Sequence, residues 1–151
     1  MQFDNSFSVR APIADVYAAV SDIERIVGCV PGAKLVERRG EDVFEVALKA
    51  QLGPMWRNFK GTITVLERDE ATHRVVMTNR ARDAKGRSVG EARIEIGLVQ
   101  LGEQTNVSIY SRATVEDGSL AEKTIQEASS KQMAEFSANL QAMVADAPAG
   151  G

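Results

Sequence analysis

Hydrophobic and polar residues alternate along most of this chain, and this is the pattern of strands with one buried face. The first such run is short and places Phe3, Asn5, Phe7 and Val9 on one face. After residue 33 the alternation resumes and continues, with interruptions, to Val115. The inward residues of these later runs are Phe44, Val46, Leu48, Ala50 and Leu52; Phe59, Gly61, Ile63 and Val65; Val75, Met77, Asn79 and Ala81; Gly90, Ala92, Ile94, Ile96 and Leu98; and Thr105, Val107, Ile109, Ser111, Ala113 and Val115.

Short turn sequences separate these runs and predict hairpins. They read GED, DEAT, DAKG and LGEQ, and each contains residues that favour tight turns. Strands joined in this way pair antiparallel, so we expect about six meandering strands after the first one.

Two segments have helical periodicity instead. Residues 11–27 begin with Pro12 in the first helical turn, and Ser21 and Asp22 end one short helix and cap a second that runs to about Gly28. The pair Pro31–Gly32 then turns the chain toward the sheet. Residues 120–145 form one long helix, with an apolar stripe of Ala121, Ile125, Ala128, Met133, Phe136, Leu140 and Met143 or Val144.

Together these elements predict an α+β fold. We expect a curved antiparallel sheet of about seven strands, two short helices, and a long C-terminal helix across the concave face. One ligand-binding domain would occupy residues 1–145, and residues 146–151 would be a flexible tail. A concave sheet closed by one helix tends to leave an elongated cavity.

The candidate ligand-binding residues are those expected to face this cavity: Phe44, Leu48, Val65, Met77, Asn79, Ile94, Ile109, Ser111, Met133, Phe136 and Leu140. Asn79 and Ser111 are polar residues on otherwise apolar faces. Either the alternation shifts at these positions, or backbone groups and water satisfy them, or they contact the polar head of an apolar ligand.

The sequence LGPMWRNFKG concentrates aromatic and basic residues at one predicted hairpin tip. Met55, Trp56, Arg57, Phe59 and Lys60 would suit a membrane interface, where rings lie at headgroup depth and cations meet phosphates. The same residues could instead dock a protein partner or pack as a lid over the cavity, and the sequence leaves these three interpretations open.

Composition and charge argue against several classes of protein. The chain has 151 residues, a net charge of −3 and one cysteine, which argues against a nucleic-acid-binding protein and against an internal disulfide. No secretory signal pattern or membrane-spanning apolar run is visible, so we expect a cytoplasmic protein, with peripheral contact at the inner face of the membrane as an option. No motif for a cofactor or a metal is present, and we expect none.

The candidates for catalysis are sparse. His73 lies in a predicted turn, and Cys29, next to a turn, is interpreted as a small buried hydrophobic residue. Nothing in the sequence brings the two together as a dyad. We therefore expect a protein that is not an enzyme.

Several local motifs, in order, resemble the CoxG family of carbon monoxide dehydrogenase subunits, within the START-like, helix-grip superfamily. They span Phe3 to Leu140 and comprise SDIERIVGCVPGA (Asp22, Cys29, Pro31, Gly32), LGPMWRNFKG (Gly53, Pro54, Phe59, Gly61), the strand with Gly90 and Ala92, and VEDGSLA (Gly118, Leu120, Ala121).

The resemblance implies an accessory protein that serves a molybdenum hydroxylase of the carbon monoxide dehydrogenase type. Its role would be membrane recruitment of that enzyme or delivery of an apolar molecule, such as a quinone-like or isoprenoid lipid. The alternatives are a helix-grip enzyme, cyclase-like or hydrolase-like, that acts on an aromatic or polyketide-like substrate, and an adaptor with a filled core.

Overall fold

The computed structural model describes residues 1–118 and 120–145. The predicted tail, residues 146–151, lies outside the described residues. In the described ranges, the strands are β1 (Gln2–Val9), β2 (Ala33–Arg38), β3 (Val43–Leu52), β4 (Met55–Asp69), β5 (Arg74–Asp83), β6 (Ser88–Leu101) and β7 (Gln104–Val115), and the helices are α1 (Ile13–Val20), α2 (Ile23–Cys29) and α3 (Glu122–Ala145).

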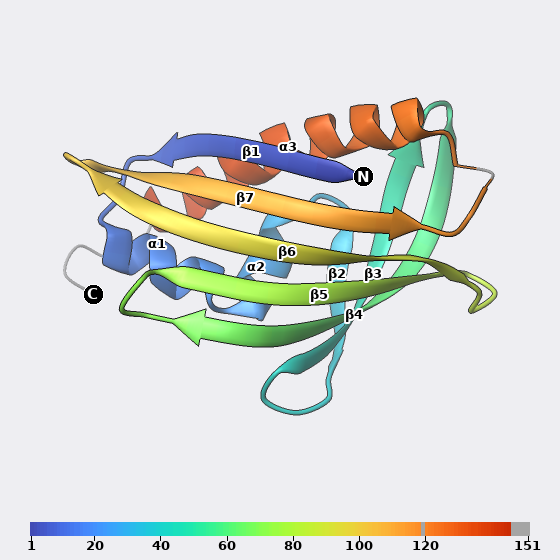
Figure 1. Cartoon of the computed structure of the whole chain (residues 1–151), viewed down its shortest axis with the longest axis horizontal. Helices are drawn as coiled ribbons and strands as arrows, with labels where there is room; N and C mark the ends of the chain where they lie inside the picture. The colour runs from blue at the N-terminus through green and yellow to red at the C-terminus, as the bar shows by residue number, and fades with distance from the viewer. Residues whose placement is uncertain (119, 146–151) are drawn as a thin grey trace.

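The strands form one antiparallel sheet of seven in the order β1-β7-β6-β5-β4-β3-β2. Strands β2 to β7 follow one another as hairpins, and β1 adds to the free edge of β7. The sheet curves around α3, which contacts both β1 and β3 (Figure 1). The α+β fold predicted from the sequence is therefore confirmed.

Local sequence explains the helix boundaries. Asp22 caps α2, because its side chain accepts a hydrogen bond from the backbone N–H of Glu24 at 3.1 Å. Pro12 was expected inside the first turn of α1, but its backbone is extended, with ψ at 146°, and it precedes the helix as the cap residue. Helix α3 begins at Glu122, two positions after the predicted start.

Helix α3 is held to the rest of the protein through its second half. Its buried residues are Phe136, Leu140 and Val144, all in that half. Asn139 donates its side-chain N–H to the carbonyl of Cys29 at 2.9 Å, and Gln141 accepts from the backbone N–H of Arg10 at 2.8 Å. In the first half, none of the described residues is buried.

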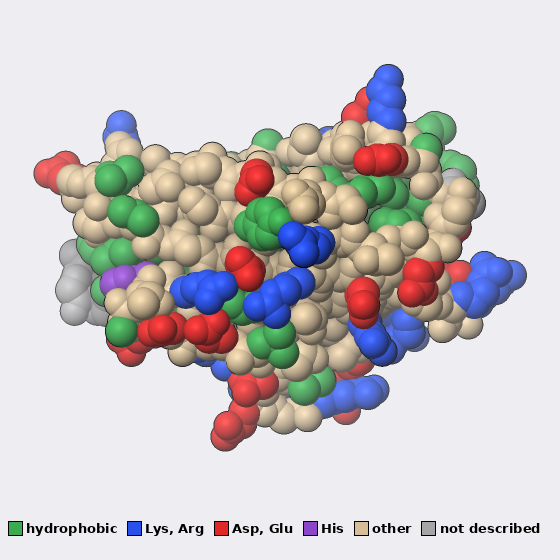
Figure 2. Space-filling model, in the orientation of Figure 1, with side chains coloured by type: hydrophobic (Ala, Val, Ile, Leu, Met, Phe, Trp, Pro, Cys, Tyr) green, Lys and Arg blue, Asp and Glu red, His purple; other side chains and the backbone are tan. Residues whose placement is uncertain are grey.

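The outer face of the sheet is polar and carries ion pairs between neighbouring strands. Arg74 lies 3.2 Å from a carboxylate oxygen of Glu67 and 3.1 Å from one of Glu95, and Arg80 pairs with Glu91 at 3.2 Å. Figure 2 shows cations and anions interspersed on this face. The alternation along the strands thus separates a solvated outer face from an apolar inner face.

None of the three helices in the described ranges is long and apolar enough to span a membrane.

Candidate ligand-binding site

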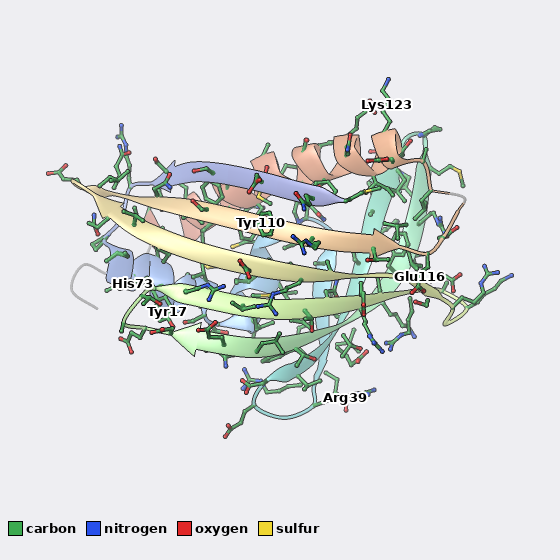
Figure 3. All side chains as sticks on the ribbon, in the orientation of Figure 1. Tyr17, Arg39, His73, Tyr110, Glu116 and Lys123 are labelled. Atoms are coloured by element: carbon green, nitrogen blue, oxygen red, sulfur yellow. The ribbon has the colours of Figure 1, made fainter. Side chains whose placement is uncertain are left out.

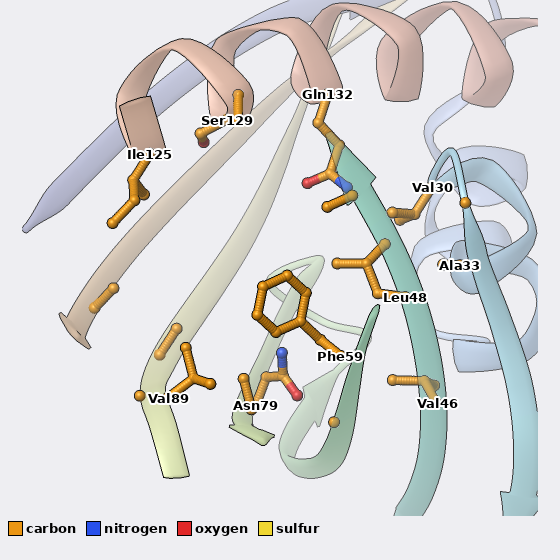
Figure 4. Close-up of a pocket in the computed structure, with 18 of the residues that line it drawn as sticks. Val30, Ala33, Val46, Leu48, Phe59, Asn79, Val89, Ile125, Ser129 and Gln132 are labelled. Atoms are coloured by element: carbon orange, nitrogen blue, oxygen red, sulfur yellow. The ribbon is translucent and has the colours of Figure 1, made fainter. Parts of the chain in front are cut away.

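The concave side of the sheet holds a cavity of about 680 Å³ beneath the first half of α3. Strands β3 to β7 provide one wall, the turn between α2 and β2 closes one side, and α3 covers it. In Figure 4, Phe59 and Asn79 on the sheet face Ile125, Ser129 and Gln132 of the helix. Most of the lining residues are apolar. The volume of the cavity is in the range of known small-molecule sites, about 300–1,000 Å³.

The cavity exists because the inward side chains become smaller toward one end of the sheet. At successive levels of the register in β4, β5 and β6, these residues are Gly61, Ala81 and Gly90; then Ile63, Asn79 and Ala92; and then Val65, Met77 and Ile94. The next level of β5 and β6 pairs Val75 with Ile96, both buried in the core. Small residues leave the space open at one end, and larger residues fill it at the other, which we call the packed end.

Asn79 is the main polar group inside the wall. Among buried side-chain nitrogen and oxygen atoms of the described residues, its Oδ1 alone has no hydrogen-bond partner in the protein. A Cβ atom on Gly61 would lie 2.6 Å from that oxygen, so the glycine leaves the room that the amide occupies. An unsatisfied buried amide group costs about 1–3 kcal/mol, and a ligand with a hydrogen-bonding head could recover part of that cost.

The Pro31–Gly32 turn, which was predicted to direct the chain toward the sheet, shapes the rim of the cavity. Both residues line it, and Gly32 has a φ of +76°, which disfavours a side chain. A Cβ at this position would lie 2.2 Å from the carbonyl oxygen of Lys49, so the turn packs directly on β3. Cys29, just before the turn, is 1% exposed, in agreement with its interpretation as a buried hydrophobic residue.

The structure separates the predicted ligand-binding residues into two groups. Leu48, Met77, Asn79 and Ile94 line the cavity. The seven that lie outside the lining are Phe44, Val65, Ile109, Ser111, Met133, Phe136 and Leu140. Most of these seven belong to the apolar core, because the second half of α3 packs onto the sheet and leaves no open space there. The expectation that all eleven residues face one cavity is therefore corrected for these seven. Contact of any of the eleven with a ligand stays a prediction.

The structure also divides the residues of the predicted hairpin tip. Met55 and Trp56 are 61% and 60% exposed beside the two-residue turn Gly53–Pro54. Phe59 points into the cavity (Figure 4), and the guanidinium carbon of Arg57 lies 5.3 Å from the centre of its ring.

Arg57 also forms an ion pair of 3.3 Å with Asp117, between β7 and α3. Lys60 is exposed, and Trp56 and Lys60 contribute to the cavity lining while Met55 and Arg57 do not. The five residues therefore do not form one continuous surface.

Cys29 and His73 have separate partners. The Cys29 Sγ lies 3.8 Å from the Sδ of Met143, and burial raises the pKa of the thiol. His73 lies in the turn before β5, as predicted, and its ring packs edge-on against Tyr17 with ring centres 5.6 Å apart (Figure 3). Neither residue lines the cavity. Among the described residues, no group of three or more His, Cys, Asp or Glu side chains could hold a metal ion.

Two buried carboxylates lie outside the cavity. Burial acts to raise the pKa of Glu45, but hydrogen bonds from Thr62 and Arg82 outweigh this effect and lower it. Asp83 accepts hydrogen bonds from the backbone N–H groups of Arg87 and Lys85, which lower its pKa. Glu45 ties neighbouring strands together and Asp83 orders a turn, so both have structural roles.

Sequence reasoning missed lining residues on several elements, including β5, β6, β7 and α3. Ala81, Gly90, Ala92 and Ala113 of the sheet were placed on inward faces but not named as site residues. Their small size at successive register positions was the available signal. Ile125 and Gln132 of α3 were missed because helical periodicity does not reveal which part of a helix lies over open space.

Solved structures with the same fold include a conserved protein from Geobacillus kaustophilus, with a TM-score of 0.80, 16% identity, and coverage of 96% of this chain and 95% of that chain. The Zhui aromatase/cyclase from Streptomyces sp. R1128 has a TM-score of 0.67 and 15% identity, and the match covers 100% of this chain and 98% of that chain. A protein from Thermus thermophilus has a TM-score of 0.67 and 15% identity, with coverage of 97% and 100%. Identities this low establish similarity of fold alone.

A search of curated protein sequences gave no significant match. The sequence profile of one family does match, over residues 6–145, which is nearly the whole chain. That family is CoxG, described as a subunit of carbon monoxide dehydrogenase. The resemblance noted in the sequence is therefore confirmed, and the chain belongs to the CoxG family of carbon monoxide dehydrogenase subunits.

Proposed function

We propose that this protein is an accessory carrier that holds an elongated apolar molecule between the sheet and α3. The observation that carries the proposal is the cavity of about 680 Å³, with its mostly apolar lining and, among the described residues, one buried amide oxygen without a hydrogen-bond partner. Among the described residues, the lining contains no histidine and no cysteine, which favours binding over catalysis. Turnover that is lost on substitution of Cys29 or His73 would instead support a helix-grip enzyme.

The ligand class follows from the wall of the cavity. A long apolar body would contact Leu48, Met77 and Ile94, and a hydrogen-bonding head would meet the amide of Asn79. A hydroxyl group on a ring would serve as such a head, because it can donate a hydrogen bond to the unpaired Oδ1, whereas a ring carbonyl could only accept from the Nδ2 of the same amide. A quinone-like or isoprenoid lipid combines these two features.

Family membership supports the proposed partner. As a member of the CoxG family, the chain would serve a molybdenum hydroxylase of the carbon monoxide dehydrogenase type. It would recruit that enzyme to the membrane or deliver the apolar molecule to it. In either role the protein would act in the cytoplasm, at the inner face of the membrane.

Extraction tests the carrier proposal directly. The purified protein would be examined by native mass spectrometry, and its organic extract by mass spectrometry for an apolar compound. Ala92→Leu places a larger side chain in the cavity wall, so we expect it to reduce the amount of bound compound severalfold. The matched control is Ala14→Leu on the exposed surface of α1, where the same change meets solvent.

One result would contradict the proposal. If wild-type protein carries no apolar compound and takes none up from a quinone or isoprenoid mixture, the carrier hypothesis fails. An adaptor that works through its surface alone would then remain.

A further inference from the structure

A second hollow, of about 290 Å³, lies against strands β2, β3 and β4. Its lining includes three lysines from three different strands: Lys34 of β2, Lys49 of β3 and Lys60 of β4. Asn58 also lines the hollow, and its side-chain amide can donate hydrogen bonds. This arrangement brings several cationic and polar donors around one concave surface.

The strand register explains why the hollow exists. Lys34 lies directly opposite Ala47, and Ala47 lies opposite Lys60. These residues alternate with inward residues such as Val46 and Leu48, so they belong to the outer face of the sheet. Directly opposed residues in neighbouring strands lie about 5 Å apart, so the two lysines flank the small alanine across about 10 Å. Their long, flexible side chains can close on a group seated above the alanine.

These lysines lack the anionic partners that other cations on the same face have. Within the described residues, Lys34, Lys49 and Lys60 form no ion pair and no side-chain hydrogen bond. On the same face, by contrast, Arg80 pairs with Glu91 and Arg82 with Glu45. Three uncompensated positive charges around a hollow are complementary to an anion with several oxygens, of which a phosphate is the common example.

The exposed apolar residues of the hairpin indicate where that phosphate belongs. The Nζ of Lys49 lies 5.5 Å from the centre of the Trp56 ring, so one of the three lysines lies against the exposed tip. Trp56 and Met55 are 60% and 61% exposed there. An exposed tryptophan beside lysines favours a membrane interface, because the ring enters the headgroup region while the cations meet phosphates.

We propose that this hollow binds the phosphate of an anionic phospholipid, and that Met55 and Trp56 enter the same leaflet. Lys34 and Lys60 hold the headgroup from two sides, and Lys49 links it to the tryptophan. The hollow shares Gly32, Leu48, Lys49, Phe59 and Lys60 with the lining of the apolar cavity. Binding at this site therefore brings the wall of the cavity to the membrane surface, which deepens the carrier function proposed above and rests on it.

Vesicle sedimentation tests the site with the whole chain. Vesicles of phosphatidylcholine alone would be compared with vesicles of phosphatidylcholine and phosphatidylglycerol in equal parts. We expect binding only to the second kind, a blue shift of Trp56 emission on binding, and weakening by added sodium chloride. Each basic residue near an anionic surface contributes about fivefold to affinity, so Lys34→Gln/Lys60→Gln should lose about thirtyfold.

The control variant removes the same charge elsewhere. Arg10→Gln/Lys85→Gln also lowers the net charge by two, at exposed positions outside the hollow, and we expect it to stay within about threefold of wild type. Circular dichroism and thermal unfolding of each variant would verify that it folds. The single variant Lys60→Gln provides a second measurement, with an expected loss of about fivefold in affinity for the anionic vesicles.

Two outcomes would overturn the proposal. The first is equal loss of binding in the two double variants, or no binding of wild type to anionic vesicles. The second is tight binding of inorganic phosphate to wild type in the absence of vesicles, measured by isothermal titration calorimetry and lost in Lys34→Gln/Lys60→Gln, because this would assign the hollow to a soluble phosphate. Neither outcome depends on the contents of the apolar cavity, so failure here would leave ligand carriage intact.

Discussion

Replacing Phe136 with alanine should cost about 3–5 kcal/mol of unfolding free energy. Phe136 lies in the second half of α3 and is 6% exposed. Its ring meets the ring of Phe7 edge-on, with centres 6.3 Å apart and planes at 76°. Truncation removes a buried aromatic side chain and leaves a void in a region where the second half of α3 packs tightly, so both the transfer and the void contribute to the loss.

The matched change on the same helix is Ile125→Ala. Ile125 is half-buried and faces the cavity, so fewer atoms surround it than surround Phe136. It loses three carbon atoms that are only partly removed from water, so we expect a cost of about 1 kcal/mol. The effects on ligand binding should be reversed: Ile125→Ala should weaken retention of the apolar compound, and Phe136→Ala should leave it nearly unchanged.

Urea unfolding followed by far-ultraviolet circular dichroism measures both costs. Trp56 is 60% exposed in the folded protein, so its emission is a poor reporter of unfolding. The measurement needs ligand-free protein, because a bound ligand would add its own stabilisation. Equal costs for the two variants, or a cost below about 1.5 kcal/mol for Phe136→Ala, would refute the division into a packed end and a cavity.

Two further predictions concern residues outside the apolar part of the cavity wall. Gly32→Ala should lower the free energy of unfolding by at least about 2 kcal/mol in the same urea assay, because the position has a positive φ and the added Cβ would lie 2.2 Å from the carbonyl oxygen of Lys49. An unchanged free energy of unfolding would contradict the close packing of this turn. Glu45→Gln should cost about 1.5–3 kcal/mol at pH 7, because it removes a charged partner of Arg82. The folded-state pKa of Glu45 is lowered, so its stabilisation is present above the ordinary glutamate pKa and lost as the pH falls through the lowered value. The difference between wild type and variant should therefore narrow below about pH 4, and a constant difference would contradict the assignment.

Much of the fold could be predicted from the alternation of residues. Runs such as Val75, Met77, Asn79 and Ala81 identified the inward face of each strand, and short turns limited the sheet to a meander. Asp22 was recognised as a helix cap because capping depends on neighbours within a few positions. These features are local, so one sequence is enough to reveal them.

The site was harder to predict because it depends on where α3 lies along the sheet. Periodicity put Phe136 and Ile125 on one stripe, yet one fills the core and the other faces open space. The division of the hairpin tip was equally hard to predict, because the cavity lining includes Trp56 and Phe59 but not Arg57, which shares a strand face with Phe59. The lysine hollow required the register, because Lys34 and Lys60 come from strands that are not adjacent in the sheet.

For the carrier function proposed above, the one-sided attachment of α3 has a consequence for how a ligand would enter. Its second half is secured by Phe136, Leu140 and Val144, whereas its first half rests mainly over the cavity. Segments with few buried contacts open at much lower free energy than the global unfolding of the protein. We therefore expect the first turns of α3 to open at a lower free energy than the hairpins and the packed end. Loading and release would then proceed on the timescale of local helix motion and would not require the protein to unfold.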